Sequence, residues 1–148
     1  MFSTIELFAG AGGLALGVEK AGFNTIGLIE FDKDACDTLR KNRAKWNVIC
    51  DDIANVANQD LEQLFGVKKG ELDLLSGGAP CQAFSYAGKK LGFGDTRGTL
   101  FAEFARCVDE VRPKMFLFEN HECIAKTLED NPLGCYNTPT GPISFFAS

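Results

Sequence analysis

Short apolar runs alternate with longer helical patterns along the first 120 residues of the chain. The apolar runs are rich in isoleucine, leucine, valine and phenylalanine, which favour extended backbone when they occur in short stretches. They predict strands at 4–8, 25–30, 47–50, 72–75 and 114–119. The stretches between them predict helices at 14–21, 32–43, 59–65 and 100–111.

This regular alternation of strand and helix is typical of an α/β fold. Successive strands joined through helices form a parallel sheet with right-handed crossovers. Ligands of such sheets collect at the carboxyl ends of the strands. We therefore look for functional residues immediately after each predicted strand.

Local signals support several of these elements. Asp32 is a candidate N-cap for the second helix, because its side chain can accept a hydrogen bond from a free backbone N–H. The run 114–119 is almost continuously apolar, as is typical of a buried parallel strand. In the last helix, apolar residues recur at helical spacing and predict a core-facing stripe of Leu100, Phe104, Cys107, Val108 and Val111.

The pattern changes after residue 120. The stretches 131–134 and 138–142 are rich in proline, glycine and threonine, and hydrophobic periodicity is lost. We predict one α/β unit over residues 1–120 and an irregular tail over 121–148.

Composition narrows the possible classes of protein. With 148 residues, 45% of them hydrophobic and 24% charged, the chain is long enough for one domain with its own core and is not intrinsically disordered. It has no apolar run long enough for a membrane span, and its N-terminus does not resemble a secretory signal. The net charge of −5 argues weakly against a stand-alone nucleic-acid binder.

The six cysteines predict neither a disulfide framework nor a metal site. No two of them form a C-x-x-C pair, and without an export signal we expect a reducing compartment. We expect a cytoplasmic protein, associated with the nucleoid if it is bacterial. No metal site is expected at the single histidine, His121, which a loop leaves solvated.

A glycine cluster follows the first strand, at residues 8–13. Glycines between a strand and a helix allow positive φ and let backbone N–H groups approach a ligand. Glu30 ends the next strand, where a carboxylate can accept both hydroxyl groups of a ribose. Together they indicate an adenosine-type cofactor, and the alternative is a tight turn without a ligand. The spacing Gly10-x-Gly12-x-x-Ala15 also satisfies the loose dinucleotide pattern.

Asp51 and Asp52 follow the third strand and precede Ile53. A carboxylate at this position could accept a hydrogen bond from an adenine amino group. Helix capping is an equally good interpretation of these residues.

The loop after the fourth strand, 77–82, presents Cys81 at a strand end. A thiol there becomes a good nucleophile if its pKa is lowered or a partner activates it. The alternative is a buried structural cysteine. The following loop, 82–97, is locally basic and rich in glycine, which predicts either a lid over a substrate or a solvated surface loop.

Glu119 follows the fifth strand at the rim of the predicted sheet. Partial burial there would raise the pKa of its carboxyl group and make it a proton donor. An ordinary exposed strand end is the alternative.

In this order and spacing, the motifs resemble those of cytosine-C5 DNA methyltransferases over about residues 3–120. The matching motifs are Phe-Ala-Gly-Ala-Gly-Gly-Leu at 8–14, Glu30, Asp52-Ile53, Gly-Gly-Ala-Pro-Cys-Gln-Ala-Phe-Ser at 77–85, Arg-Gly-Thr-Leu-Phe at 97–101 and Glu119-Asn120. Departures from the family pattern are Ala79, where proline is usual, and His121-Glu122 after Glu119-Asn120.

The resemblance implies a Rossmann-like, S-adenosylmethionine-dependent methyltransferase fold, of which this chain would hold the front part. Cys81 would attack cytosine C6, and Glu119 would hold and protonate N3. The cytosine would be flipped out of double-stranded DNA. The S-adenosylmethionine pocket would be lined by Phe8, Gly10, Gly13, Glu30, Phe31, Asp52, Ile53, Pro80 and Leu100.

The family's later motifs and its target recognition domain have no counterpart in the sequence. We therefore expect that a C-terminal region or a second chain supplies target recognition. Two alternatives remain open: a tRNA cytosine-C5 methyltransferase of the same family, and a nicotinamide-dependent oxidoreductase.

Overall fold

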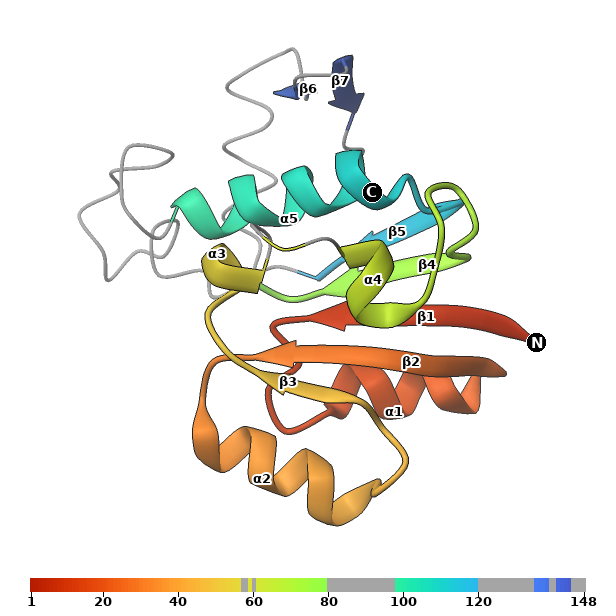
Figure 1. Ribbon diagram of the computed structural model, residues 1–148, viewed down its shortest axis with the longest axis vertical. Coiled ribbons are helices and arrows are strands. Elements are labelled where there is room, and N and C mark those ends of the chain that lie inside the picture. The colour runs from red at the N-terminus through yellow and green to blue at the C-terminus, as the bar shows by residue number, and fades with distance from the viewer. Residues whose placement is uncertain (57–58, 60, 80–97, 120–134, 139–140, 145–148) are drawn as a thin grey trace.

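The computed structural model describes residues 1–56, 59, 61–79, 98–119, 135–138 and 141–144. Its main feature is a five-stranded, all-parallel sheet with the strand order β3-β2-β1-β4-β5 (Figure 1). The strands are β1 (Phe2–Leu7), β2 (Phe23–Glu30), β3 (Val48–Cys50), β4 (Leu74–Gly77) and β5 (Met115–Phe118). This arrangement confirms the predicted α/β class and the five predicted strands.

The five helices join consecutive strands of the sheet. They are α1 (Gly13–Lys20), α2 (Lys33–Asn42), α3 (Ile53–Val56), α4 (Leu61–Phe65) and α5 (Gly98–Val111). Helix α2 begins as predicted, because the side chain of Asp32 accepts a hydrogen bond of 2.8 Å from the backbone N–H of Ala35.

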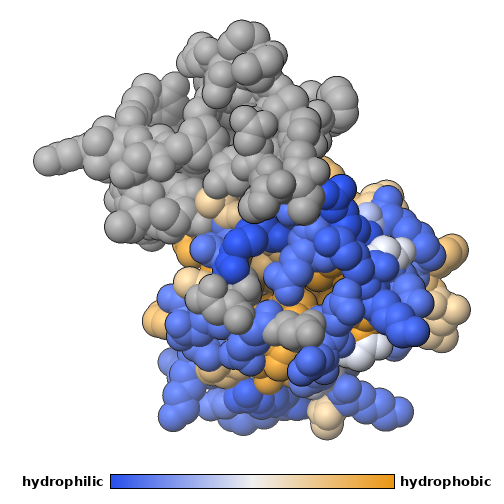
Figure 2. Space-filling model, turned by 45° about the horizontal axis from the view of Figure 1, so that its top comes forward, coloured by the Kyte–Doolittle hydropathy of each residue, from blue (hydrophilic) through white to orange (hydrophobic). Residues whose placement is uncertain are grey.

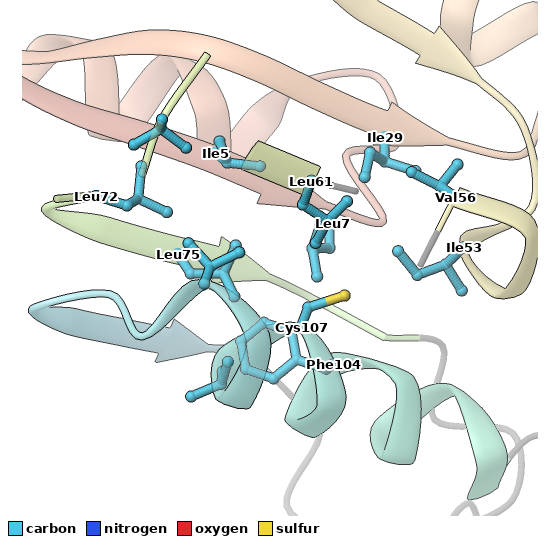
Figure 3. Packing of buried hydrophobic residues seen from close by; sticks show 13 residues of the cluster. Ile5, Leu7, Ile29, Ile53, Val56, Leu61, Leu72, Leu75, Phe104 and Cys107 are labelled. Carbon is cyan, nitrogen blue, oxygen red and sulfur yellow. The ribbon is translucent and has the colours of Figure 1, made fainter. Parts of the chain in front are cut away.

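Helices cover both faces of the sheet. On one face, side chains of α3, α4 and α5 pack on β1 and β4 around Leu7, Leu75 and Phe104 (Figure 3). On the other face, Leu28 of β2 packs with Ala15 of α1 and Leu39 of α2. Both faces of the central strands are therefore buried, whereas polar residues dominate the described surface seen in Figure 2.

Strand β5 differs from the fully buried strand that the sequence predicts. Met115 and Leu117 are 55% and 44% exposed, whereas Phe116 and Phe118 pack against Phe104 of α5. The reason is its place at the edge of the sheet: among the described elements, α5 covers only one of its faces. The expectation of burial on both faces is thus wrong for this strand.

Two further differences concern short elements. The turn of helix α3 was not expected after the third strand. Within the predicted irregular tail, β6 (Cys135–Thr138) and β7 (Gly141–Ser144) pair antiparallel. Tyrosine, threonine and isoleucine in these two segments favour extended backbone, and the two strands satisfy each other's backbone hydrogen bonds by pairing. The division at residue 120 stays a prediction.

Glu6 is an ionisable residue in the middle of the sheet. Its side chain is 2% exposed, and its Oε2 atom has no hydrogen-bond partner. Burial raises the pKa of this carboxyl group to about 7, although hydrogen bonds from the Ala15 backbone and the Ser76 side chain oppose the shift.

This raised pKa predicts a loss of stability as the pH rises. Between about pH 4.5 and 7, folded Glu6 keeps a proton that the unfolded chain has released. The free energy of unfolding should therefore fall across this range, by an amount on the order of 3 kcal/mol, and level off above it. Urea denaturation at pH 5 and pH 8 measures the change. In the Glu6→Gln variant the decrease in the free energy of unfolding between the two pH values should be much smaller. An equal decrease in both proteins would contradict the assignment.

Candidate active site

The carboxyl ends of β1, β2, β3 and β4 meet around a cavity of about 480 Å³. This volume suits a cofactor-sized ligand. Its lining combines apolar walls with acidic side chains at the strand ends: Phe8, Gly10, Ile29, Glu30, Phe31, Asp51, Asp52, Ile53, Gly78 and Leu100. Seven of these were predicted to line a cofactor pocket: Phe8, Gly10, Glu30, Phe31, Asp52, Ile53 and Leu100.

Glu30 connects two loops at the cavity. Its Oε2 accepts a hydrogen bond of 2.7 Å from the N–H of Gly10, and its Oε1 accepts one of 2.8 Å from the N–H of Asp32. The carboxylate therefore ties the glycine loop after β1 to the start of α2. Each oxygen keeps a further lone pair, so the group can also accept hydrogen bonds from a ligand.

The glycine loop follows an unusual backbone path. Phe8, Gly10 and Gly12 have φ angles of 56°, 54° and 90°, in the left-handed region. A Cβ atom on Gly10 would meet nothing within 4 Å, which leaves the backbone open toward the cavity. Phe8 is not a glycine, and such a conformation in a bulky residue often marks a functional site.

The two aspartates after β3 act both locally and at the cavity. Asp52 caps α3 by accepting a hydrogen bond of 2.9 Å from the N–H of Ala54. Asp51 accepts hydrogen bonds from the Asn55 side chain and from the Asp52 N–H, and these lower the pKa of its carboxyl group. Both aspartates also line the cavity, so helix capping and a place at the site coexist.

The charge of the cavity limits the ligands that suit it. In the lining that the structure describes, three acidic side chains occur without any lysine, arginine or histidine. These three carboxylates oppose the charge of a pyrophosphate placed beside them. Hydroxyl groups, amino groups and cationic centres are favoured instead. The nicotinamide dinucleotide suggested by the glycine spacing is thus a poor match.

Glu119 lies next to the cavity wall. Its N–H donates a 2.8 Å hydrogen bond to the carbonyl of Gly77, and its Oε2 lies 2.8 Å from the point that a Cβ on Gly78 would occupy. A side chain at position 78 would displace the Glu119 carboxyl group from this position, whereas glycine leaves room for it. The predicted partial burial is wrong, because Glu119 is exposed: it follows Met115 and Leu117 on the uncovered face of the edge strand.

One predicted cofactor residue is absent from the described lining of the cavity. Gly13 begins α1 and does not line it. Pro80, Cys81 and the loop 82–97 lie outside the described residues. Conversely, Ile29 and Gly78 line the cavity but were not assigned to the cofactor, and Asp51 was considered only together with Asp52 as an acceptor for an adenine amino group. Their places directly beside Glu30, Asp52 and Gly77 are the signal that could have identified them.

The described part of the chain contains neither a ready metal site nor a membrane-spanning helix. There, no cluster of three or more histidine, cysteine or acidic side chains could hold a metal ion. None of the helices described is both long and apolar enough to cross a bilayer.

An open parallel sheet with an acidic cavity at its strand ends defines a Rossmann-like class of protein. Comparison with known families identifies the class more closely. Residues 2–133 match the family model of the C-5 cytosine-specific DNA methylases, and the chain belongs to this family. The match extends past residue 120.

Known relatives and solved structures agree with this assignment. The chain is 58% identical to the type II methyltransferase M.PspPI of Psychrobacter sp. over 125 residues, which are 84% of this chain and 28% of that protein. It is 56% identical to M.Eco47II of Escherichia coli over 120 residues, 81% of this chain and 27% of the relative. The chain thus spans little more than a quarter of the length of these relatives.

Two solved structures share the fold. One is a prophage-encoded E. coli protein described as a DNA modification methyltransferase, with a TM-score of 0.69, 30% identity, and coverage of 87% of this chain and 37% of that one. The other is a Spodoptera frugiperda DNMT2 variant, with a TM-score of 0.64, 20% identity, and coverage of 88% and 39%. The latter supports the fold alone.

The glycine loop yields a test of its geometry. Gly12 has a φ of 90°, and a Cβ atom there would lie 2.7 Å from Cδ2 of Leu39. Gly12→Ala should therefore lower the free energy of unfolding by about 2–3 kcal/mol. Gly17, inside α1 with open space around it, is the matched control, and Gly17→Ala should raise stability by up to about 1 kcal/mol. Thermal denaturation compares the two, and equal effects would contradict the proposed strain.

Proposed function

We propose that the cavity binds S-adenosylmethionine and that the complete enzyme transfers its methyl group to C5 of cytosine in DNA. The observation that carries this proposal is the acidic cavity built around Glu30, in a chain of the C-5 cytosine-specific DNA methylase family. Because the chain spans only part of its relatives, the substrate and the activity of the whole protein are part of the proposal.

The residues at the cavity suit the chemical groups of this cofactor. The spare lone pairs of Glu30 suit the two ribose hydroxyls, and Asp52 suits the adenine amino group. Phe31 is 74% exposed at the cavity and offers an apolar surface to a flat ring. The negative charge of the lining favours the sulfonium cation. When bound, the cofactor supplies an electrophilic methyl group.

Cys81 and Glu119 are the residues that we assign to the cytosine. The Cys81 thiolate would add to C6 while Glu119 holds and protonates N3. The addition converts C5 from a poor nucleophile into an enamine carbon that can accept a methyl group. Loss of the C5 proton then allows the bond between Cys81 and C6 to break. The exposure of Glu119 leaves its carboxyl group accessible to a base that enters from solvent.

DNA is the proposed partner because the relatives are type II methyltransferases. The cytosine would have to be flipped out of the duplex, since C6 is not accessible inside the base stack. A C-terminal region or a second chain would carry target recognition. The lid role of the loop 82–97, the cofactor contact of Pro80 and a cytoplasmic location belong to the same proposal.

Binding of S-adenosylhomocysteine tests the role of Glu30. Replacing Glu30 by glutamine places an amide N–H₂ against one of the backbone N–H donors and weakens the acceptor for a ribose. We expect Glu30→Gln to reduce affinity about 10- to 100-fold in isothermal titration calorimetry. Glu71→Gln removes the same charge from an exposed residue and should leave affinity unchanged. Equal affinity of Glu30→Gln and wild type, or preferential binding of NADH, would refute the assignment.

Covalent trapping tests the role of Cys81. In a chimaera, the 120 residues of this chain that align with M.Eco47II replace their counterparts in that protein, which restores the rest of an enzyme. It should form a stable adduct with duplex DNA containing 5-fluorocytosine, detected as a shifted band in denaturing gels. Cys81→Ser should abolish the band, whereas Cys107→Ser changes a cysteine of the core and should retain it in folded protein. Trapping by Cys81→Ser would exclude the nucleophile, and methyl transfer to tRNA instead of DNA would exclude the proposed substrate.

A further inference from the structure

Two cysteines that the proposed reaction does not use lie against the backbone of Glu30. The Cys36 thiol, in the first turns of α2, donates a hydrogen bond of 3.3 Å to the Glu30 carbonyl oxygen. Cys50 ends β3 and is the register partner of Glu30 across the β2–β3 pair. The N–H of Asp51, which follows Cys50, donates to the same carbonyl oxygen at 3.1 Å. The Glu30 carbonyl oxygen therefore accepts hydrogen bonds from Cys36 itself and from the residue that follows Cys50.

The two thiols are also neighbours electrostatically. Burial raises the pKa of Cys36 to about 12, and interaction with the Cys50 side chain is the next largest cause. The two residues are 14 positions apart in the chain, and both lie against Glu30, which Cys36 contacts through its thiol and Cys50 faces across the strand pair. Both are free thiols in the structure.

Their exposure to solvent differs in a useful way. Cys36 is fully buried, whereas Cys50 is exposed. An oxidant from solvent would reach Cys50 first, and Cys36 would be protected from direct attack. An accessible thiol with a second thiol beside it is the arrangement of redox-sensitive pairs.

We propose that Cys36 and Cys50 form a reversible disulfide under peroxide and that this bond weakens cofactor binding at the adjacent cavity. In the first step Cys50 attacks hydrogen peroxide, which gives a sulfenic acid and releases water. In the second, the Cys36 sulfur attacks the Cys50 sulfur, and the hydroxyl group leaves with the Cys36 proton as a second water. A dithiol reductant reverses the reaction and restores both thiols.

The effect on the cavity follows from the shared acceptor. A disulfide removes the S–H donor from the Glu30 carbonyl and holds the sulfurs about 2.05 Å apart. The bond would link the end of β3 directly to the start of α2. Glu30 and Asp51 line the cavity on these two sides, so their carboxylates would shift relative to a bound ligand. The effect on binding thus depends on the proposed function, whereas formation of the disulfide does not.

Peptide mapping tests the bond itself. The full chain is treated with hydrogen peroxide or dithiothreitol, alkylated and digested with trypsin. Cys36 then lies in the peptide 34–40 and Cys50 in 46–68, and neither contains another cysteine. We expect the two peptides to be linked after peroxide, with loss of two hydrogen atoms, and separate after dithiothreitol. Absence of the linked pair would overturn the proposal.

Titration with S-adenosylhomocysteine tests the consequence. Oxidation should weaken binding about tenfold, and dithiothreitol should restore it. Cys50 lies outside the described cavity lining. The Cys50→Ser variant should therefore bind S-adenosylhomocysteine like reduced wild type, and peroxide should not change its affinity. Cys36→Ala serves the same purpose if the first variant fails to fold. Linked peptides with unchanged affinity would overturn the regulatory role alone. No binding by the reduced chain would refute the proposed function and this role with it, while the mapping still decides whether the disulfide forms.

Discussion

The cavity depends on one carboxylate held between two loops. Glu30 accepts the Gly10 N–H with one oxygen and the Asp32 N–H with the other, at the carboxyl end of a central strand. This bridge adds to the hydrogen bond from the Ala9 N–H to the Ile29 carbonyl and to the packing of Ala9 with Leu39 of α2, and together they hold the glycine loop in its left-handed backbone path. The Glu30 carboxylate thereby joins the glycine loop, the end of β2 and the start of α2 into one wall of the cavity. Its unused lone pairs remain available to a ligand.

Local hydrogen bonds to the other carboxylates explain how an acidic cavity remains compatible with folding. Asp51 and Asp52 accept hydrogen bonds from their own neighbours, which stabilises their carboxylates before any ligand arrives. The field that they create repels phosphates and favours hydroxyl, amino and sulfonium groups. A glycine-rich loop alone is common to many nucleotide folds, and in this cavity it is combined with three carboxylates.

The edge of the sheet shapes the catalytic side of the proposed site. Among the described elements only α5 covers β5, and it does so on one face, so alternate residues of β5 face outward and Glu119 continues that outward series. The neighbouring Gly78 leaves room for its carboxyl group. An acid that must meet a base entering from solvent is better placed on such an edge than in the core, where Glu6 shows what burial does to a carboxyl group.

Local pattern alone predicted the alternating elements and the cap at Asp32, because propensity and capping act within a few residues. The set of cofactor residues came instead from the resemblance of the motifs to a known family, and seven of them line the cavity. Tertiary structure alone decided that β5 is a half-exposed edge, that Glu119 is exposed, and that Cys36 lies beside Cys50. These properties depend on the order in which strands pair and on which helix covers each face. That order is set by packing between segments distant in the chain. The sequence of a single apolar run does not indicate which strands or helices will lie beside it.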